Sequence, residues 1–260
     1  MTVRYRLDLA WDGSEFSGWQ QQSRGRTVQG ELARVLAKLG EAACPQGAGR
    51  TDARVHALEF PVHVDLERPW PPDELTRALR AHLPRDLHVR RVRVVPPRFH
   101  ARFDARSRTY LYALALADNP FFRFRRWVVA VLPPAWWVEG ELKILRGSEN
   151  FSALVRAGAP SDARCRIQDA GWRPLSEGAV FHVTADRFMY GMMRALSGTL
   201  VQGFRNGARA GHLGRVLAGE RAAASAPPQG LYFAGARYAG EEPPEMPMGG
   251  LMRVAGLGER

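Results

Sequence analysis

The sequence predicts an α+β protein made of two ferredoxin-like, or RRM-like, halves, each with an antiparallel sheet. Stretches in which apolar residues alternate with polar ones are typical of strands, and they are interspersed with stretches of helical periodicity. The first 95 residues give the order β-α-(loop)-β-α-β, and the second half repeats a similar order. With 260 residues, the chain is long enough for two small domains with ample core. We expect the boundary after residue 105, which gives domains 1–105 and 106–260.

The first half is expected to begin with a strand over residues 3–11, where polar and apolar side chains alternate. A helix is expected over 28–39, because Thr27 is a suitable N-cap and the apolar residues lie on one stripe. A second alternating strand over 58–66 contains Pro61, which cannot donate to a sheet and predicts an edge or a bulge. The remaining elements of this half are a helix over about 73–83 and a strand over 87–95.

The second half is expected to contain three strands and three helices before an irregular tail. The strands are predicted at 109–116, 165–173 and 178–186, and the helices at 135–146, 187–203 and 212–218. Residues 239–260 are rich in proline and glycine and predict a tail without regular structure.

The charge of the chain favours a polyanionic partner. Its net charge is +11, with 37 basic residues, and lysine stands only at positions 38 and 143. Arginine binds phosphates with two parallel hydrogen bonds and stacks on bases, so its dominance suits RNA, although a GC-rich genome also favours arginine. A membrane surface is the competing partner, but no long basic amphipathic helix is found. Arginines interleaved with Phe and Tyr between residues 90 and 126 predict the surface that contacts RNA.

The sequence also indicates a cellular compartment. Cys44 and Cys165 form no disulfide framework and no zinc spacing, which favours a reducing cytoplasm. The first residues do not resemble a signal peptide, and no stretch is long enough to span a membrane. We therefore expect a cytoplasmic protein with no membrane association.

The loop over residues 48–57 contains the strongest candidate for catalysis. Asp52 lies there between Arg50 and Arg54, and nearby cations keep a carboxylate ionised. An ionised, shielded carboxylate can act as a nucleophile or a general base. The alternative is a turn in which Asp52 only bonds the backbone. The residues by themselves leave both interpretations open.

Other constellations are weaker. His56 and His63 would point to opposite faces of a strand, and with Glu59 they make a poor metal site, so we expect no metal. Trp19 could stack on a base, but an aromatic residue in this context is more often part of the core. Glycine-rich phosphate loops and the G-x-S-x-G motif of hydrolases are absent from the sequence.

Several segments resemble one known family. The stretch GRTDARVHA at residues 49–57 resembles the GRTDxGVHA signature of the TruA family of tRNA pseudouridine synthases. Similar matches, in the family's order, are FSGWQ at 16–20, FHARF at 99–103, RTYLY at 108–112, GSENFS at 147–152, FMYGMMR at 188–194 and APPQGLYF at 226–233. One departure is Arg54, where the family usually has the glycine that permits a positive φ.

The resemblance implies a fold and a function. It implies the pseudouridine synthase fold, with the two halves joined around a central active-site cleft. It implies a homodimer that isomerises uridine to pseudouridine in the anticodon stem-loop of tRNA, at positions 38 to 40, without a cofactor. The implied nucleophile is Asp52, and attack on the ribose C1′ or on the base stays open. The implied substrate-binding residues are Tyr110 against the target base, Arg194 paired with the catalytic Asp, Arg50 beside it, and Leu231 at the border of the base.

Two other classes of protein fit the sequence less well. A non-catalytic RNA-binding protein of two RRM-like halves would carry the RNP-type aromatic motif, which is not found. A glycosidase acting on nucleosides would need a second acid near Asp52, where the sequence places arginines. The tRNA pseudouridine synthase is therefore the favoured interpretation.

Overall fold

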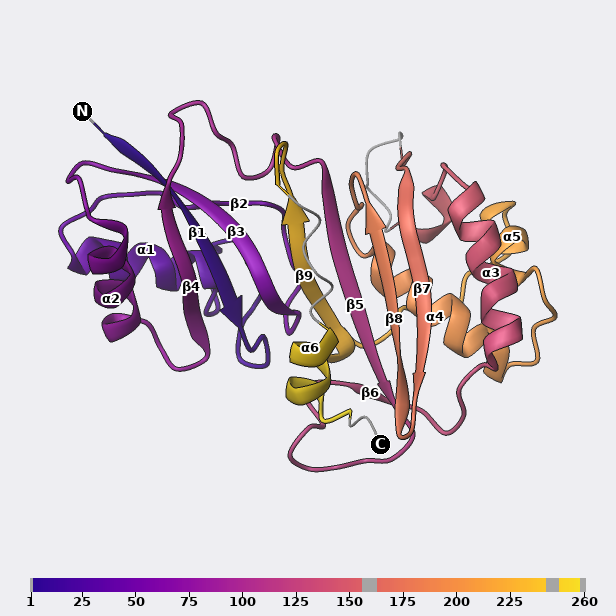
Figure 1. The fold of residues 1–260 in the computed structure, drawn as a ribbon. Coiled ribbons are helices and arrows are strands. Elements are labelled where there is room, and N and C mark those ends of the chain that lie inside the picture. The colour runs from indigo at the N-terminus through magenta and orange to yellow at the C-terminus, as the bar shows by residue number, and fades with distance from the viewer. Residues whose placement is uncertain (1, 156–162, 242–247, 258–260) are drawn as a thin grey trace. The chain divides into compact units, whose positions relative to one another are not determined.

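The computed structural model describes residues 2–155, 163–241 and 248–257 (Figure 1). Its helices and mostly antiparallel strands confirm the predicted α+β class. Contacts divide the chain into two compact units. The first comprises Met1–Arg106 with Phe233–Glu245, and the second Ser107–Tyr232 with Met246–Arg260. The division into two domains after residue 105 stays a prediction. The central active-site cleft implied by the resemblance also stays a prediction.

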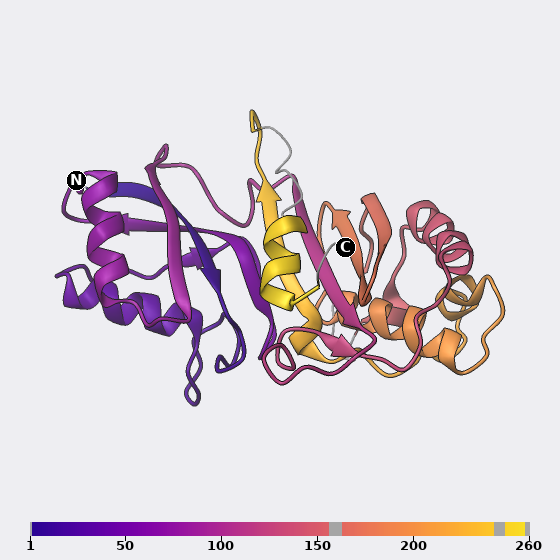
Figure 2. The same ribbon diagram turned by 60° about the horizontal axis from the view of Figure 1, so that its bottom comes forward.

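The first unit has the ferredoxin-like order β-α-β-β-α-β. Its elements are β1 (Val3–Trp11), α1 (Val28–Lys38), β2 (Gln46–Gly47), β3 (His56–Leu66), α2 (Pro72–His82) and β4 (Leu87–Val94). Strand β1 pairs antiparallel with β3 and with β4, and β2 pairs antiparallel with β3. Helix α2 packs against β4 and contacts α1 (Figures 1 and 2). These bounds agree with the predicted elements to within two residues.

Local chemistry explains two of these elements, and of the edge or bulge predicted at Pro61 the structure has a register shift beside it. Thr27 caps α1, because its side chain accepts a hydrogen bond from the Gly30 N–H at 3.2 Å. Pro61 does not lie on an edge strand, since β3 has β1 on one side and β2 on the other. The register of β1 and β3 instead shifts between Leu9 and Trp11, close to the proline.

The polar face of β1 is buried as well as its apolar face. Arg6 and Asp8 form an ion pair of 2.8 Å on that face. Arg6 also donates to Glu241 at 2.7 Å, and its guanidinium lies 4.4 Å from the ring centre of Tyr238. Simple alternation predicts solvent on this face, but residues from the far end of the sequence cover it. Partners of opposite charge make the burial of Arg6 and Asp8 tolerable.

The second unit places three antiparallel strands beside its helices. Its elements are β5 (Ser107–Ala115), β6 (Trp127–Val128), α3 (Ala135–Gly147), β7 (Ile167–Leu175), β8 (Gly178–Ala185), α4 (Met192–Arg205), α5 (His212–Leu217), the first residues of β9 (Leu231–Arg237), and α6 (Met248–Ala255), with short 3-10 turns at Ser152–Leu154 and Pro228–Gly230. Strand β8 pairs antiparallel with β5 and β7. Helix α3 packs along β7 and contacts α5 (Figure 1).

Two predictions for this unit need correction. Helix α4 starts at Met192 rather than at 187, because Gly191 takes a φ of 76° that ends the preceding turn and serves as the N-cap. The tail is not irregular throughout, since residues 248–255 form α6, with Met248 and Leu251 buried on one side. The other predicted tail residues at 242–247 and 258–260 lie outside the described residues.

The end of α6 depends on a buried arginine. Arg126 donates to the carbonyls of Ala255 and Gly256 at 3.4 and 2.9 Å. It donates also to the carbonyl of Ala117 at 3.3 Å. Arg126 therefore satisfies the last carbonyls of a helix, as cations near a helix C-terminus do. None of the helices in the described ranges has the length and apolar character needed to cross a membrane.

Candidate active site

Asp52 is the first residue of a hydrogen-bonded turn. The Val55 N–H donates to the Asp52 carbonyl at 3.3 Å, which closes the turn over 52–55. Arg54, its third residue, has a φ of 64° and is the one non-glycine with a positive φ in the described ranges. A positive φ at that position alone is typical of a type II turn and favours glycine. The turn thus has the conformation of a glycine-containing turn although an arginine occupies the position.

Residues 11–19 hold this turn in place through two backbone N–H···O bonds and one indole N–H. Three hydrogen bonds join the two segments: Trp19 N–H to the Thr51 carbonyl at 3.2 Å, Arg54 N–H to the Phe16 carbonyl at 3.0 Å, and Trp11 Nε1–H to the Val55 carbonyl at 3.0 Å. The backbone on both sides of Asp52 is therefore fixed by the preceding segment of the chain.

Two glycines allow this close approach. A Cβ atom at Gly13 would lie 2.3 Å from the Val55 carbonyl oxygen. A Cβ atom at Gly18, whose φ is 100°, would lie 2.6 Å from the carbonyl oxygen of Thr51. The pattern FSGWQ had suggested only a resemblance, and the structure gives the reason for its glycine.

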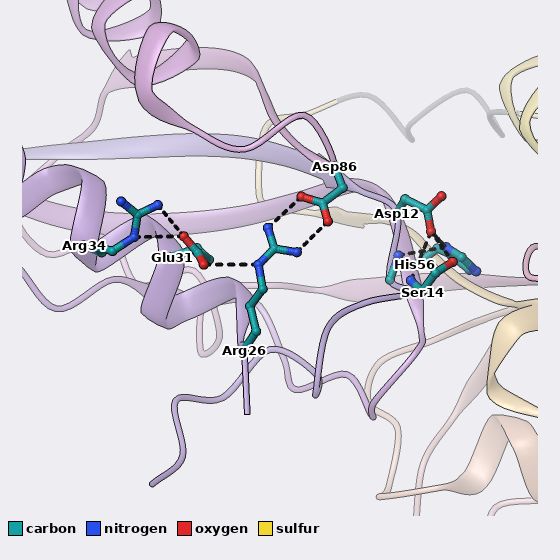
Figure 3. Close-up of polar contacts among 8 residues, drawn as sticks. Asp12, Ser14, Arg26, Glu31, Arg34, His56 and Asp86 are labelled. Carbon is teal, nitrogen blue, oxygen red and sulfur yellow. Dashed lines mark hydrogen bonds and ion pairs between the residues drawn. The ribbon is translucent and has the colours of Figure 1, made fainter. Parts of the chain in front are cut away.

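Salt bridges anchor the segment that holds the turn (Figure 3). Arg26 bonds both carboxylate oxygens of Asp86, at 2.6 and 2.8 Å, and Glu31 at 3.1 Å. Its hydrogen bonds to Asp86 raise the pKa of Arg26. The guanidinium also lies 4.2 Å from the ring centre of Phe16, whose carbonyl holds Arg54. A chain of contacts therefore connects α1 and the start of β4 to the Asp52 turn.

His56 and Asp12 fix the other end of the loop. The Gly13 N–H donates to His56 Nδ1 at 2.9 Å, and the same nitrogen lies 3.3 Å from Asp12 Oδ1. Ser14 donates to that oxygen from its N–H and its hydroxyl, at 3.0 and 2.6 Å (Figure 3). The described residues contain no group of three possible ligands that could hold a metal ion. His56 thus supports the loop conformation.

Trp19 belongs to the core. It is buried, and its ring centre lies 6.1 Å from that of Trp11 and 4.7 Å from that of Phe60. This confirms the favoured interpretation over base stacking.

The two arginines nearest to Asp52 in the sequence are exposed to solvent. Asp52 is half-buried, whereas Arg50 and Arg54 are exposed. Neither guanidinium makes a hydrogen bond or an ion pair with another described residue. Neither arginine forms an ion pair with Asp52, and that nearby cations keep this carboxylate ionised stays a prediction.

In the second unit, the segment at 226–231 connects two predicted substrate-binding residues, Arg194 and Leu231. Arg194, in the first turn of α4, donates from Nε to the Ala226 carbonyl at 2.8 Å. The Ala226 N–H donates back to the Arg194 carbonyl at 2.8 Å. The Tyr112 hydroxyl donates to the Pro227 carbonyl at 2.7 Å. This segment then leads into the buried Leu231 at the start of β9.

Tyr110 lies two residues before Tyr112 on β5, so the two rings are on the same face of the strand. Tyr110 is 9 % exposed, and its ring packs edge-on against Phe188 at 4.8 Å. Burial raises the pKa of Tyr112 well above its usual value, although the charge of Arg194 opposes this shift. Tyr112 was not among the site residues predicted from the sequence, although it is the second tyrosine of the RTYLY segment that resembles the family.

The predicted site residues are thus distributed over both units. Asp52 and Arg50 belong to the first unit, and Tyr110, Arg194 and Leu231 belong to the second. Within the second unit, Arg194 is tied to the segment that ends at Leu231. That the two sets act on one nucleotide stays a prediction.

Two arginines of the stretch predicted to contact RNA bond other groups of the protein. Arg126 is buried at the end of α6, and Arg93 bonds Asp8 at 3.0 Å. Neither is placed as an open phosphate contact. Exposed aromatic rings remain beside arginines: Phe103, Phe121 and Phe124, with the Arg123 guanidinium 4.6 Å from the ring centre of Phe124.

Comparison with known proteins identifies the family. Residues 142–239 match a family model described as tRNA pseudouridine synthase. A protein of Methylacidiphilum infernorum named tRNA pseudouridine synthase A is 38% identical, over 77% of this chain and 80% of the relative. Proteins of the same name are 37% identical in Parabacteroides distasonis, over 78% and 85%, and 37% identical in Thermus thermophilus, over 76% and 81%. A signature in the first unit agrees with a family match that lies mostly in the second, and the chain belongs to the family of tRNA pseudouridine synthases.

Proposed function

We propose that this protein isomerises uridine to pseudouridine in the anticodon stem-loop of tRNA, at positions 38 to 40, with Asp52 as the nucleophile. The chain belongs to a family of isomerases that act on tRNA. In the reaction, the bond between N1 and C1′ breaks, the uracil turns, and a bond between C5 and C1′ forms. The proton of C5 is lost and N1 gains one, so the mass is conserved and no redox group is required.

The observation that carries the proposal is the setting of Asp52. Its backbone is fixed on both sides by hydrogen bonds to residues 11–19, while its side chain is only half-buried. Reactions are accelerated when the reacting group is held in place before the substrate arrives. A carboxylate in a rigid turn with a substrate-accessible side chain meets that requirement.

The second unit supplies the proposed contacts to the base. Tyr110 would contact the flipped uracil and Leu231 would border it, because a target base must leave its stack to be reached. Arg194 and Arg50 would hold the substrate and stabilise the charge on Asp52. We further propose that the protein is a cytoplasmic homodimer; light scattering of the purified protein would test the dimer.

The decisive experiment uses Asp52→Asn. This variant keeps the shape of the side chain and removes the negative charge and the nucleophile. We expect tRNA binding and thermal stability to persist while pseudouridine formation is abolished. The measurement is tritium release from tRNA labelled at C5 of uridine, under single-turnover conditions with saturating enzyme.

The control is Asp73→Asn, an equal change at an exposed position on α2, which should leave the rate unaltered. Turnover by Asp52→Asn at even a tenth of the unmodified protein's rate would remove Asp52 from the nucleophile's role. If Asp52 only bonds the backbone, the variant should instead lose up to about 1–2 kcal/mol of stability and keep its activity.

A further inference from the structure

Arg54 combines features that the fold does not explain. Its φ of 64° lies in the left-handed region, where a Cβ atom crowds the backbone and glycine is favoured. Its N–H bonds the Phe16 carbonyl at 3.0 Å, so the conformation is fixed. Its side chain is exposed and makes no hydrogen bond or ion pair with any described residue. The folded protein thus contains a residue in a strained conformation whose guanidinium makes no hydrogen bond or ion pair with the described residues.

The position of Arg54 places it beside the reacting group. It follows Asp52 by two residues within one turn, so the two Cα atoms lie within about 7 Å. A uridine bound at Asp52 has a phosphodiester on each side of its ribose. The planar guanidinium presents paired donors that match two phosphate oxygens. A positive side chain that extends into solvent from this turn is therefore suited to a backbone phosphate.

We propose that Arg54 binds a phosphate of the RNA backbone next to the target uridine. This inference rests on the proposed function, because it requires RNA bound at Asp52. An alternative is that Arg54 keeps Asp52 ionised, but no ion pair joins the two side chains. A contact to phosphate carries no base information, so Arg54 contributes to affinity and position rather than to sequence choice.

Two variants separate the charge from the strain. Arg54→Gln removes the charge and keeps the Cβ atom in the left-handed conformation. Arg54→Gly removes the charge and the strain together. Affinity for unmodified tRNA, measured over a series of salt concentrations, reports the phosphate contact. Single-turnover pseudouridine formation at saturating enzyme reports the chemical step.

We expect both variants to bind tRNA about fivefold to tenfold more weakly at low salt, as loss of a charged hydrogen bond predicts. The slope of log affinity against log salt should become shallower by roughly 0.7 to 0.9, the effect of one phosphate. The single-turnover rate at saturation should match that of the unmodified protein. Only the melting temperatures should differ, with Arg54→Gly above Arg54→Gln.

The control is Arg77→Gln, which removes one charge from an exposed position on α2. It should change neither the affinity nor the slope by a comparable amount. Unchanged affinity and slope in both Arg54 variants would overturn the proposal, and so would an equal change in Arg77→Gln. If the unmodified protein binds tRNA but forms no pseudouridine, the proposed function fails, and the salt slopes still decide whether Arg54 binds phosphate.

Discussion

The turn that carries Asp52 is held mainly by backbone groups, whereas the segment at 226–231 in the second unit is held mainly by side chains. Around Asp52, carbonyls and N–H groups of residues 11–19 bond the loop, and glycines allow the two backbones to meet. At 226–231, Arg194 and Tyr112 donate to successive carbonyls. The difference implies that the Asp52 turn is sensitive to added bulk, and that the 226–231 segment is sensitive to the loss of single polar atoms.

The largest effect is expected from Gly18→Ala. The added Cβ would lie 2.6 Å from the Thr51 carbonyl oxygen and 3.1 Å from the Asp52 carbonyl carbon, at a φ of 100°. We expect a loss of about 2–3 kcal/mol in the free energy of unfolding. Displacement of the Asp52 backbone should slow single-turnover pseudouridine formation by about 100-fold, measured below the melting temperature.

The matched control for this prediction is Gly40→Ala. Gly40 also has a positive φ, of 84°, but its added Cβ would have no neighbour within 4 Å. This variant should lose about 1 kcal/mol of stability and keep its activity. Equal activity in the two variants would show that the contact between Gly18 and the loop does not position Asp52.

A smaller effect is expected from acid, through His63 in the first unit. His63 accepts a hydrogen bond from the Ala101 N–H at 3.1 Å, and burial together with the charges of His100 and Arg4 lowers its pKa to about 4. Since the unfolded chain takes up this proton near pH 6.5, the stability contributed by neutral His63 is complete above pH 6.5 and is lost as the pH falls towards 4. The loss amounts to at most about 3 kcal/mol.

His63→Asn tests this linkage, because the amide oxygen can accept the same hydrogen bond and does not titrate. Denaturant unfolding at a series of pH values should give the variant a flatter stability profile than the unmodified protein between pH 6.5 and 4. Parallel profiles would assign the acid sensitivity to other groups. The hydrogen bond from Tyr112 to the Pro227 carbonyl should not change between pH 6.5 and 4, because the pKa of Tyr112 is raised above its usual value of 10.0.

The smallest effect is expected from Tyr112→Phe. The variant loses one hydrogen bond, to the Pro227 carbonyl at 2.7 Å, which should cost about 1 kcal/mol of stability. Since the same segment bonds Arg194 and leads to Leu231, we expect single-turnover pseudouridine formation to fall by roughly tenfold, the equivalent of about 1.4 kcal/mol.

Tyr232→Phe provides the comparison, because the buried Tyr232 donates a similar hydrogen bond to the Arg125 carbonyl at 2.6 Å. Both variants should lose similar stability, but only Tyr112→Phe should lose activity. A similar loss of activity in both would mean that the effect comes from general weakening of the second unit.

Much of the fold follows from local patterns. The α+β class and most element positions were predictable, because burial on one face imposes a period of two on a strand and of 3.6 on a helix. The helix at α6 was missed because two glycines and the surrounding prolines conceal three buried positions, Met248, Leu251 and Ala255. The start of α4 was misplaced because the left-handed φ of Gly191 leaves no mark on hydrophobic periodicity.

The sequence by itself determined the class of the fold, the basic character of the chain and the family to which the Asp52 signature points. Only the tertiary structure decided which charged residues bond other groups of the fold and which are exposed on the surface. Arg126 and Arg54 belong to the same residue type, yet one bonds the last carbonyls of α6 and the other is exposed on the Asp52 turn. Gly13 and Gly18 became meaningful only when their neighbours, 41 to 42 and 33 to 34 residues away, were in place. Contacts between residues far apart in sequence set the burial of each group, and burial decides whether a charge stabilises the fold or is available for RNA.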